Sequence, residues 1–164
     1  MPKLSKDGDE RRDMLWRYAF NKAEHQILNS PDTAVANNCR KDVLRVLKGL
    51  LEDLKWPGLK SYYLKTLMLH EFESHERDDW KVTDLGQRVI DAVMRLRNNV
   101  SNGYLEHYFL SDCNILSKLS QEQKTQLMAK LNKFLGNPNA IINALTGGTK
   151  GKLLIQQREW NIHC

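Results

Sequence analysis

Several residues of this chain have the types and spacing of an anion-binding site. Lys41, Arg45 and Lys48 are separated by four and then three residues, which places their charges on one face of a helix. Ser61 and Tyr62 stand where another helix is expected to begin, so free backbone amides, a hydroxyl and an aromatic ring come together. This pattern favours a site for nucleotide or nucleic acid. A solvated helix face is the simpler alternative.

Other residues have the chemistry of known sites but the wrong spacing. His70 and His75 flank two glutamates, yet the zinc-protease helix needs histidines four residues apart, and these are five apart. Residues 147–152 are rich in Gly and Lys but lack the first Gly and the final Ser or Thr of a phosphate-binding loop. Two pairs of acidic residues lie in polar connecting segments: Asp7 with Asp9, and Glu76 with Asp78. We therefore assign no catalytic and no metal-binding residue.

Helical spacing of apolar residues covers most of the chain and predicts the elements that carry these side chains. Helices are expected over about 21–28, about 36–55, 61–72, 83–102 and 121–135, with a further short turn over 139–145. Their inward-facing residues include Val43, Leu47, Leu50, Leu64, Leu67, Met68, Val89, Val93, Leu96, Leu127, Leu131 and Phe134. No alternating strand pattern is visible. The fold class is therefore all-α, a compact bundle of five or six short helices.

Local signals mark several helix ends. Asn21 with Glu24, and Ser120 with Gln123, have the spacing of capping boxes that open helices. Gly103 is expected to close the helix over 83–102. The aromatic segment from Tyr104 to Ile115 has no clear form.

Composition limits the chain to one domain with a core of its own. Of its 164 residues, 41% are hydrophobic and 27% charged, and the net charge of +5 permits an anionic partner.

No segment has the length and apolar character of a membrane span or a signal peptide, so we expect a cytoplasmic or nuclear protein without a membrane partner. Cys39, Cys113 and Cys164 are expected to be reduced thiols.

Short motifs follow one another across residues 15–142 with a recognisable order and spacing. They are Leu15-Trp16-Arg17-Tyr18-Ala19-Phe20, Cys39-Arg40-Lys41-Asp42, Ser61-Tyr62-Tyr63-Leu64-Lys65-Thr66, Leu85-Gly86-Gln87-Arg88, Leu105-Glu106-His107-Tyr108-Phe109 and Asn114-Ile115-Leu116. Together they resemble the C-terminal helical lobe of the Mab-21 family, which includes cyclic GMP-AMP synthase and its invertebrate receptor relatives.

The resemblance implies one lobe of a two-lobed nucleotidyltransferase. It divides the chain into a polar segment over 1–14, a helical domain over 15–145 and a Gly-rich basic tail over 146–164. By resemblance, the nucleotide-contacting positions are Arg17, Lys48, Ser61 and Tyr62, and the basic surface toward nucleic acid is formed by Arg40, Lys41 and Arg45. A complete member would use Mg or Mn with ATP and GTP on a catalytic lobe that these residues do not supply, so no cofactor is assigned to this chain.

Three hypotheses follow for function. The first is a helical lobe that contacts nucleotide, and in some members double-stranded nucleic acid, without catalysis alone. The second is a protein-interaction scaffold with an inert inherited site, which binds a catalytic lobe or a second copy. The third is part of an active enzyme that makes cyclic dinucleotides. A zinc-dependent grip on DNA is not expected, because residues 30–38 contain no His or Cys and Cys39 alone cannot form a four-ligand site.

Overall fold

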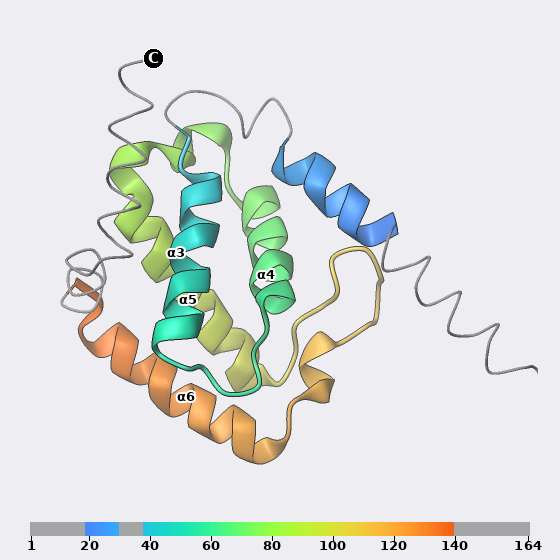
Figure 1. The fold of residues 1–164 in the computed structure, drawn as a ribbon, viewed down its shortest axis with the longest axis vertical. Coiled ribbons are helices and arrows are strands. Elements are labelled where there is room, and N and C mark those ends of the chain that lie inside the picture. The colour runs from blue at the N-terminus through green and yellow to red at the C-terminus, as the bar shows by residue number, and fades with distance from the viewer. Residues whose placement is uncertain (1–18, 30–37, 140–164) are drawn as a thin grey trace, which may run out of the picture.

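Helices form the part of the chain that the structure describes, residues 19–29 and 38–139 of a computed structural model (Figure 1). A helical segment covers residues 19–28, and the four longer helices are α3 (Arg40–Asp53), α4 (Ser61–Ser74), α5 (Leu85–Asn102) and α6 (Gln121–Gly136). Short 3₁₀ turns are η1 (Arg77–Trp80), η2 (Val82–Asp84) and η3 (Ile115–Lys118). These residues form no strand, and the all-α prediction is confirmed.

The core lies where α5 packs against α3, α4 and α6 (Figure 1). In each of these four helices the predicted apolar residues are the buried ones, because helical spacing puts them on one side. Fully burying one such side chain stabilises the fold by about 1.5–3 kcal/mol relative to leaving it in water. The apolar stripes thus fix both the helices and the way they pack.

Two predicted helix ends are confirmed. The Ser120 hydroxyl accepts the Gln123 amide at 3.1 Å, and the Gln123 side chain accepts the Ser120 amide at 2.9 Å, which completes the capping box of α6. Gly103 ends α5 in the left-handed conformation, with φ of 68°. Sequence alone was sufficient at both ends because the interactions are local.

Two predicted helix starts are wrong. Asn21 does not cap a helix, because the helix already includes residues 19 and 20. The second helix begins at Arg40 instead of near residue 36, because the Cys39 amide donates to the Trp80 carbonyl at 2.9 Å and the Asn38 side chain accepts the Arg40 amide at 2.9 Å. A long-range contact with η1 therefore sets this boundary.

The segment between α5 and η3 is an irregular loop organised by Asn114. Its side chain accepts the Leu105 amide at 3.0 Å and the Leu116 amide at 3.1 Å, and it donates to the Gly103 carbonyl at 2.8 Å. The His107 amide donates to the Cys113 carbonyl at 2.8 Å. One side chain thus holds both ends of the loop together.

Candidate anion-binding site

A cluster of opposite charges forms where the helix over 19–28 approaches α3 and α4. The Lys65 ammonium lies 3.6 Å from a carboxylate oxygen of Glu24, whose side chain is only 13% exposed. Lys48 on α3 is the third member: burial lowers its pKa, nearby Lys65 lowers it further, and Glu24 raises it. The cluster therefore has one ion pair, Lys65 with Glu24, and a second lysine whose charge both of them influence, so its positive charges outnumber its negative charge.

Aromatic contacts hold the helix over 19–28 beside this cluster. The Phe20 ring stacks on Phe109 with centroids 5.2 Å apart and planes 4° apart, and it also contacts His107 at 5.1 Å. The Lys41 ammonium donates to the Asn29 side chain at 2.7 Å at the other end of the helix. Both ends of the segment are thus attached to the described fold.

His107 lies at the border of the cluster. Burial lowers its pKa, the Glu24 carboxylate opposes that shift, and Lys118 and His70 add to it. Its Nδ1 accepts the Phe109 amide at 3.1 Å, and protonation of that nitrogen would remove the acceptor. The ring is therefore held neutral at neutral pH.

Ser61 and Tyr62 lie at the start of α4, with Ser61 exposed and Tyr62 partly buried, but the N-cap is Lys60 and not Ser61 as the sequence predicted, and no side chain caps this helix. The Tyr62 ring stacks on Tyr63 at 4.2 Å, and burial, then the Tyr63 hydroxyl, raises the pKa of Tyr62. A neutral ring supported on one side by a second ring is suited to stacking on a base. Arg17, the remaining predicted nucleotide-contacting residue, lies outside the described residues.

The predicted nucleic-acid surface is only partly an exposed basic face. Arg45 is 57% exposed at its side chain, but it pairs with Asp42 at 3.0 Å. Arg40 is buried at 7% exposure, with its guanidinium 5.3 Å from the Phe72 ring centroid and 5.5 Å from the Trp80 ring centroid. Arg40 therefore does not extend the exposed face, because η1 brings Trp80 over it.

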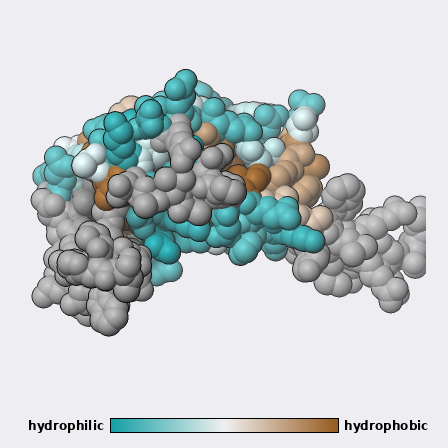
Figure 2. Space-filling view, turned by 90° about the horizontal axis from the view of Figure 1, so that it is seen from above, coloured by the Kyte–Doolittle hydropathy of each residue, from teal (hydrophilic) through white to brown (hydrophobic). Residues whose placement is uncertain are grey.

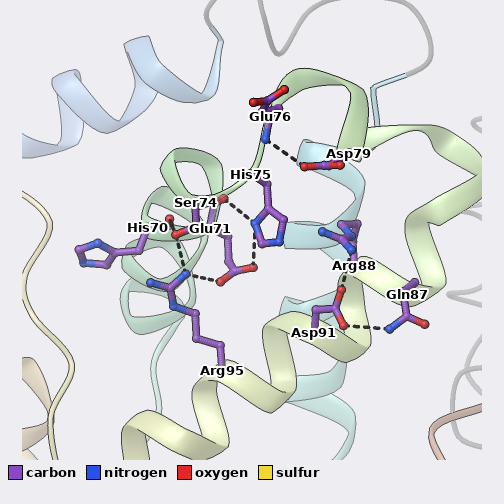
Figure 3. Close-up of polar contacts among 10 residues, drawn as sticks. All are labelled: His70, Glu71, Ser74, His75, Glu76, Asp79, Gln87, Arg88, Asp91 and Arg95. Carbon is purple, nitrogen blue, oxygen red and sulfur yellow. Dashed lines mark hydrogen bonds and ion pairs between the residues drawn. The ribbon is translucent and has the colours of Figure 1, made fainter.

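A second polar cluster surrounds Glu71, in the segment that resembles a zinc helix. His70 and His75 point apart (Figure 3): His70 contacts the Glu106 carbonyl at 2.9 Å, and His75 contacts the Glu71 carbonyl at 3.1 Å. The Glu71 carboxylate pairs with Arg95 at 2.5 Å. Among the described residues, no group of three or more His, Cys, Asp or Glu is placed to hold a metal ion.

Sequence reasoning missed Glu24, Lys65 and His107 as members of the candidate site. Lys65 lay inside a quoted motif, four residues after Ser61, which is one helical turn and therefore the same face. Glu24 and His107 had no such signal, because they come from segments far apart in the chain. Only the folded structure brings Glu24 to Lys65 and His107 into the field of Glu24.

The region that holds most of this site matches a known family. Residues 39–133 match the family model of the Mab-21 protein HhH/H2TH-like domain. The chain belongs to the Mab-21 family. The described helices of this Mab-21 domain place Lys48, Ser61, Tyr62 and Lys65 on consecutive helices, α3 and α4.

Individual members of the family are similar over most of this chain. Protein mab-21-like 3 of Danio rerio is 32% identical over 133 residues, which are 78% of this chain and 33% of that protein. Cyclic GMP-AMP synthase of Mus musculus is 27% identical over 160 residues, 88% of this chain and 32% of the enzyme. A cyclic GMP-AMP synthase-like receptor of Magallana gigas is 26% identical over 74% of this chain and 21% of its own length. The chain thus spans about a third or less of these relatives.

The hydropathy of the helices and of the surface adds three observations. No helix within residues 19–29 and 38–139 is both long and apolar enough to cross a bilayer. Figure 2 shows a largely hydrophilic face from above, with apolar residues gathered toward the side that carries the helix over 19–28 in Figure 1. Large exposed apolar side chains include Tyr104 and Leu110 in the loop after α5.

Proposed function

We propose that this chain is a nucleotide-contacting helical lobe of a Mab-21 protein, with Lys48 and Lys65 facing the phosphates. The observation that carries the proposal is the Lys65–Glu24 pair at 3.6 Å, beside which Lys48 adds a second positive charge, so the site keeps a positive excess. The start of α4 adds free amides and the exposed Ser61. Tyr62 supplies an aromatic ring for a base. Phosphate oxygens are strong acceptors for such donors.

The proposal gives this chain binding and positioning, and leaves transfer chemistry to a metal-binding lobe outside these residues. A bound Mg or Mn ion there would supply charge neutralisation for phosphoryl transfer. Incubation of the purified chain with ATP, GTP, either metal and duplex nucleic acid should yield no dinucleotide. Formation of a linear or cyclic dinucleotide would show that the chain is an enzyme by itself.

Calorimetric titration with ATP tests the binding role. The charge-removing variant Lys48→Gln should bind ATP at least about tenfold more weakly, because each lost charge-assisted hydrogen bond is worth about 1.5–3 kcal/mol. Lys133→Gln, which removes an exposed lysine on α6, is the matched control and should bind as the wild type does. Equal affinity of Lys48→Gln and the control would refute the site.

Duplex nucleic acid is the second candidate ligand, and the exposed guanidinium of Arg45 favours it. Its contacts would lie on α3 at Lys41 and Arg45, which precede Lys48 on the same helix. The same titrations with duplex RNA and DNA separate the two, because duplex affinity should fall steeply with salt and with charge reversal at these two residues.

A scaffold role, which the exposed Tyr104 and Leu110 favour, predicts self-association by light scattering and no ligand in either titration.

A further inference from the structure

Glu24 places a negative charge against the two lysines assigned to ligand phosphates. Phe20, Glu24 and Leu28 are spaced by four residues, so they share one face of the helix over 19–28. Leu28 packs against the core, and Phe20 stacks on Phe109. The face that carries Glu24 is therefore turned toward the fold, and its carboxylate is 13% exposed.

The position of this carboxylate is fixed at two points. One turn before Glu24, the Phe20 ring contacts both His107 and Phe109, with ring centroids 5.1 and 5.2 Å away. At the end of the helix, the Asn29 side chain accepts a hydrogen bond of 2.7 Å from Lys41. Flexible exposed carboxylates pair with lysines at little net gain, but this one is held against them by contacts on both sides.

A buried carboxylate and a ligand phosphate need the same partners. Each is an anion that accepts hydrogen bonds from ammonium groups, and neither is stable away from water without them. Lys65 lies 3.6 Å from Glu24, and Glu24 also acts on Lys48. A phosphate that binds both lysines must therefore compete with Glu24 for the same donors.

We infer that Glu24 is an internal anion which occupies the lysine pair in the free chain and which a phosphate ligand must displace. This inference rests on the proposed function and adds a rule for ligand choice. A ligand with several phosphates gains more from the two lysines than a monophosphate does, so only the former overcomes the carboxylate. Glu24 thus raises the affinity for the two lysines that a ligand needs in order to bind. Polyphosphates meet this requirement more readily than monophosphates do.

Titration with inorganic tripolyphosphate, which has no base or sugar, tests the inference. Glu24→Gln keeps the shape of the side chain and removes its charge, so it should bind tripolyphosphate about tenfold more tightly than the wild type. Glu122→Gln makes the same charge change at an exposed position on α6 and should leave the affinity unchanged. Inorganic phosphate must displace the same carboxylate, so it should gain from Glu24→Gln by a similar factor while remaining the weaker ligand.

Three outcomes separate this inference from the proposed function. Tighter binding by Glu24→Gln, with no change in Glu122→Gln, supports both. Equal or weaker binding by Glu24→Gln, while Lys48→Gln still weakens the binding of ATP, overturns the inference and leaves the site standing. No binding of tripolyphosphate or ATP by any of these proteins overturns both.

A second variant keeps the inference testable if Glu24→Gln fails to fold. Glu24→Asp keeps the charge but withdraws it by one methylene, and it should bind tripolyphosphate more tightly than the wild type and less tightly than Glu24→Gln. Circular dichroism and thermal melts identify any variant that is unfolded. If Glu24→Gln is unfolded, the affinity of Glu24→Asp decides, and an affinity at or below that of the wild type overturns the inference.

Discussion

Glu71 and Glu24 are both largely buried carboxylates, but their surroundings differ. Glu71 is 4% exposed at its side chain and lies between Arg95, at 2.5 Å, and His75, at 3.6 Å. Arg95 also donates to the Ser74 hydroxyl at 2.9 Å, so its guanidinium joins α5 firmly to α4. The guanidinium, a planar and always charged group, pairs closely with one carboxylate. We call this cluster closed, because its carboxylate has a matched counter-ion in Arg95. Its role is structural.

The cluster at Glu24 is open by comparison. Its shortest ion pair is 3.6 Å, and two lysines face one carboxylate instead of one arginine facing one. Ammonium groups are compact charges on flexible stems and can exchange one anion for another. On the proposed function, the carboxylate with a matched cation stabilises the fold, and the carboxylate with surplus cations marks the ligand site.

The largest effect on stability is expected from Arg95→Met. It leaves the Glu71 carboxylate buried without its main counter-ion, so the free energy of unfolding in urea should fall by about 3 kcal/mol. Arg45→Met, which breaks an exposed pair with Asp42, is the control and should cost less than about 1 kcal/mol. Equal losses would remove the contrast between a closed cluster and a surface pair. Affinity for tripolyphosphate should not change in either folded variant.

A smaller effect on stability is expected from Lys48→Gln. This change removes a half-buried cation whose pKa is already lowered by burial and by Lys65, so the free energy of unfolding should stay within about 1 kcal/mol of the wild type or rise. Urea unfolding beside the ATP titration checks it. A loss as large as that of Arg95→Met would mean that the open cluster is also structural.

The smallest effect is a pH dependence from His107. Its pKa is lowered in the folded chain, so the unfolded chain binds the proton more strongly, and the free energy of unfolding should fall as the pH drops below the ordinary value of 6.5. His107→Asn has no titrating ring, and its side-chain oxygen can still accept the Phe109 amide. Urea unfolding at several pH values should therefore give a flatter profile for this variant between pH 7 and 5. An unchanged profile would assign the dependence to other groups.

Local patterns were sufficient for most of the fold. The apolar stripes of α3, α4, α5 and α6 follow from spacing alone, as do the capping box at Ser120 and the left-handed end at Gly103. The start of α3 could not be predicted, because it depends on Trp80, which lies 41 residues after Cys39. The burial of Arg40 has the same cause.

The sequence was sufficient to predict some residues of the candidate site but not its counter-ion. Lys48, Ser61 and Tyr62 were identified by spacing, by the expected helix start and by the family resemblance. Glu24 lies 41 residues before Lys65, so no periodic pattern could connect them. The counter-ion of the site, on which the proposed competition for phosphate rests, became apparent only when the helix packing was known.

The hydrogen bonds of Asn114 affect which residues unfold together when the structure opens locally. One amide side chain bonds to Gly103, Leu105 and Leu116, so it joins the two ends of a loop that also contacts α4 through the Glu106 carbonyl and His70. Phe109, against which Phe20 stacks, lies inside that loop. A transient opening at Asn114 would therefore loosen the loop and the helix over 19–28 together, as one cooperative unit in hydrogen exchange.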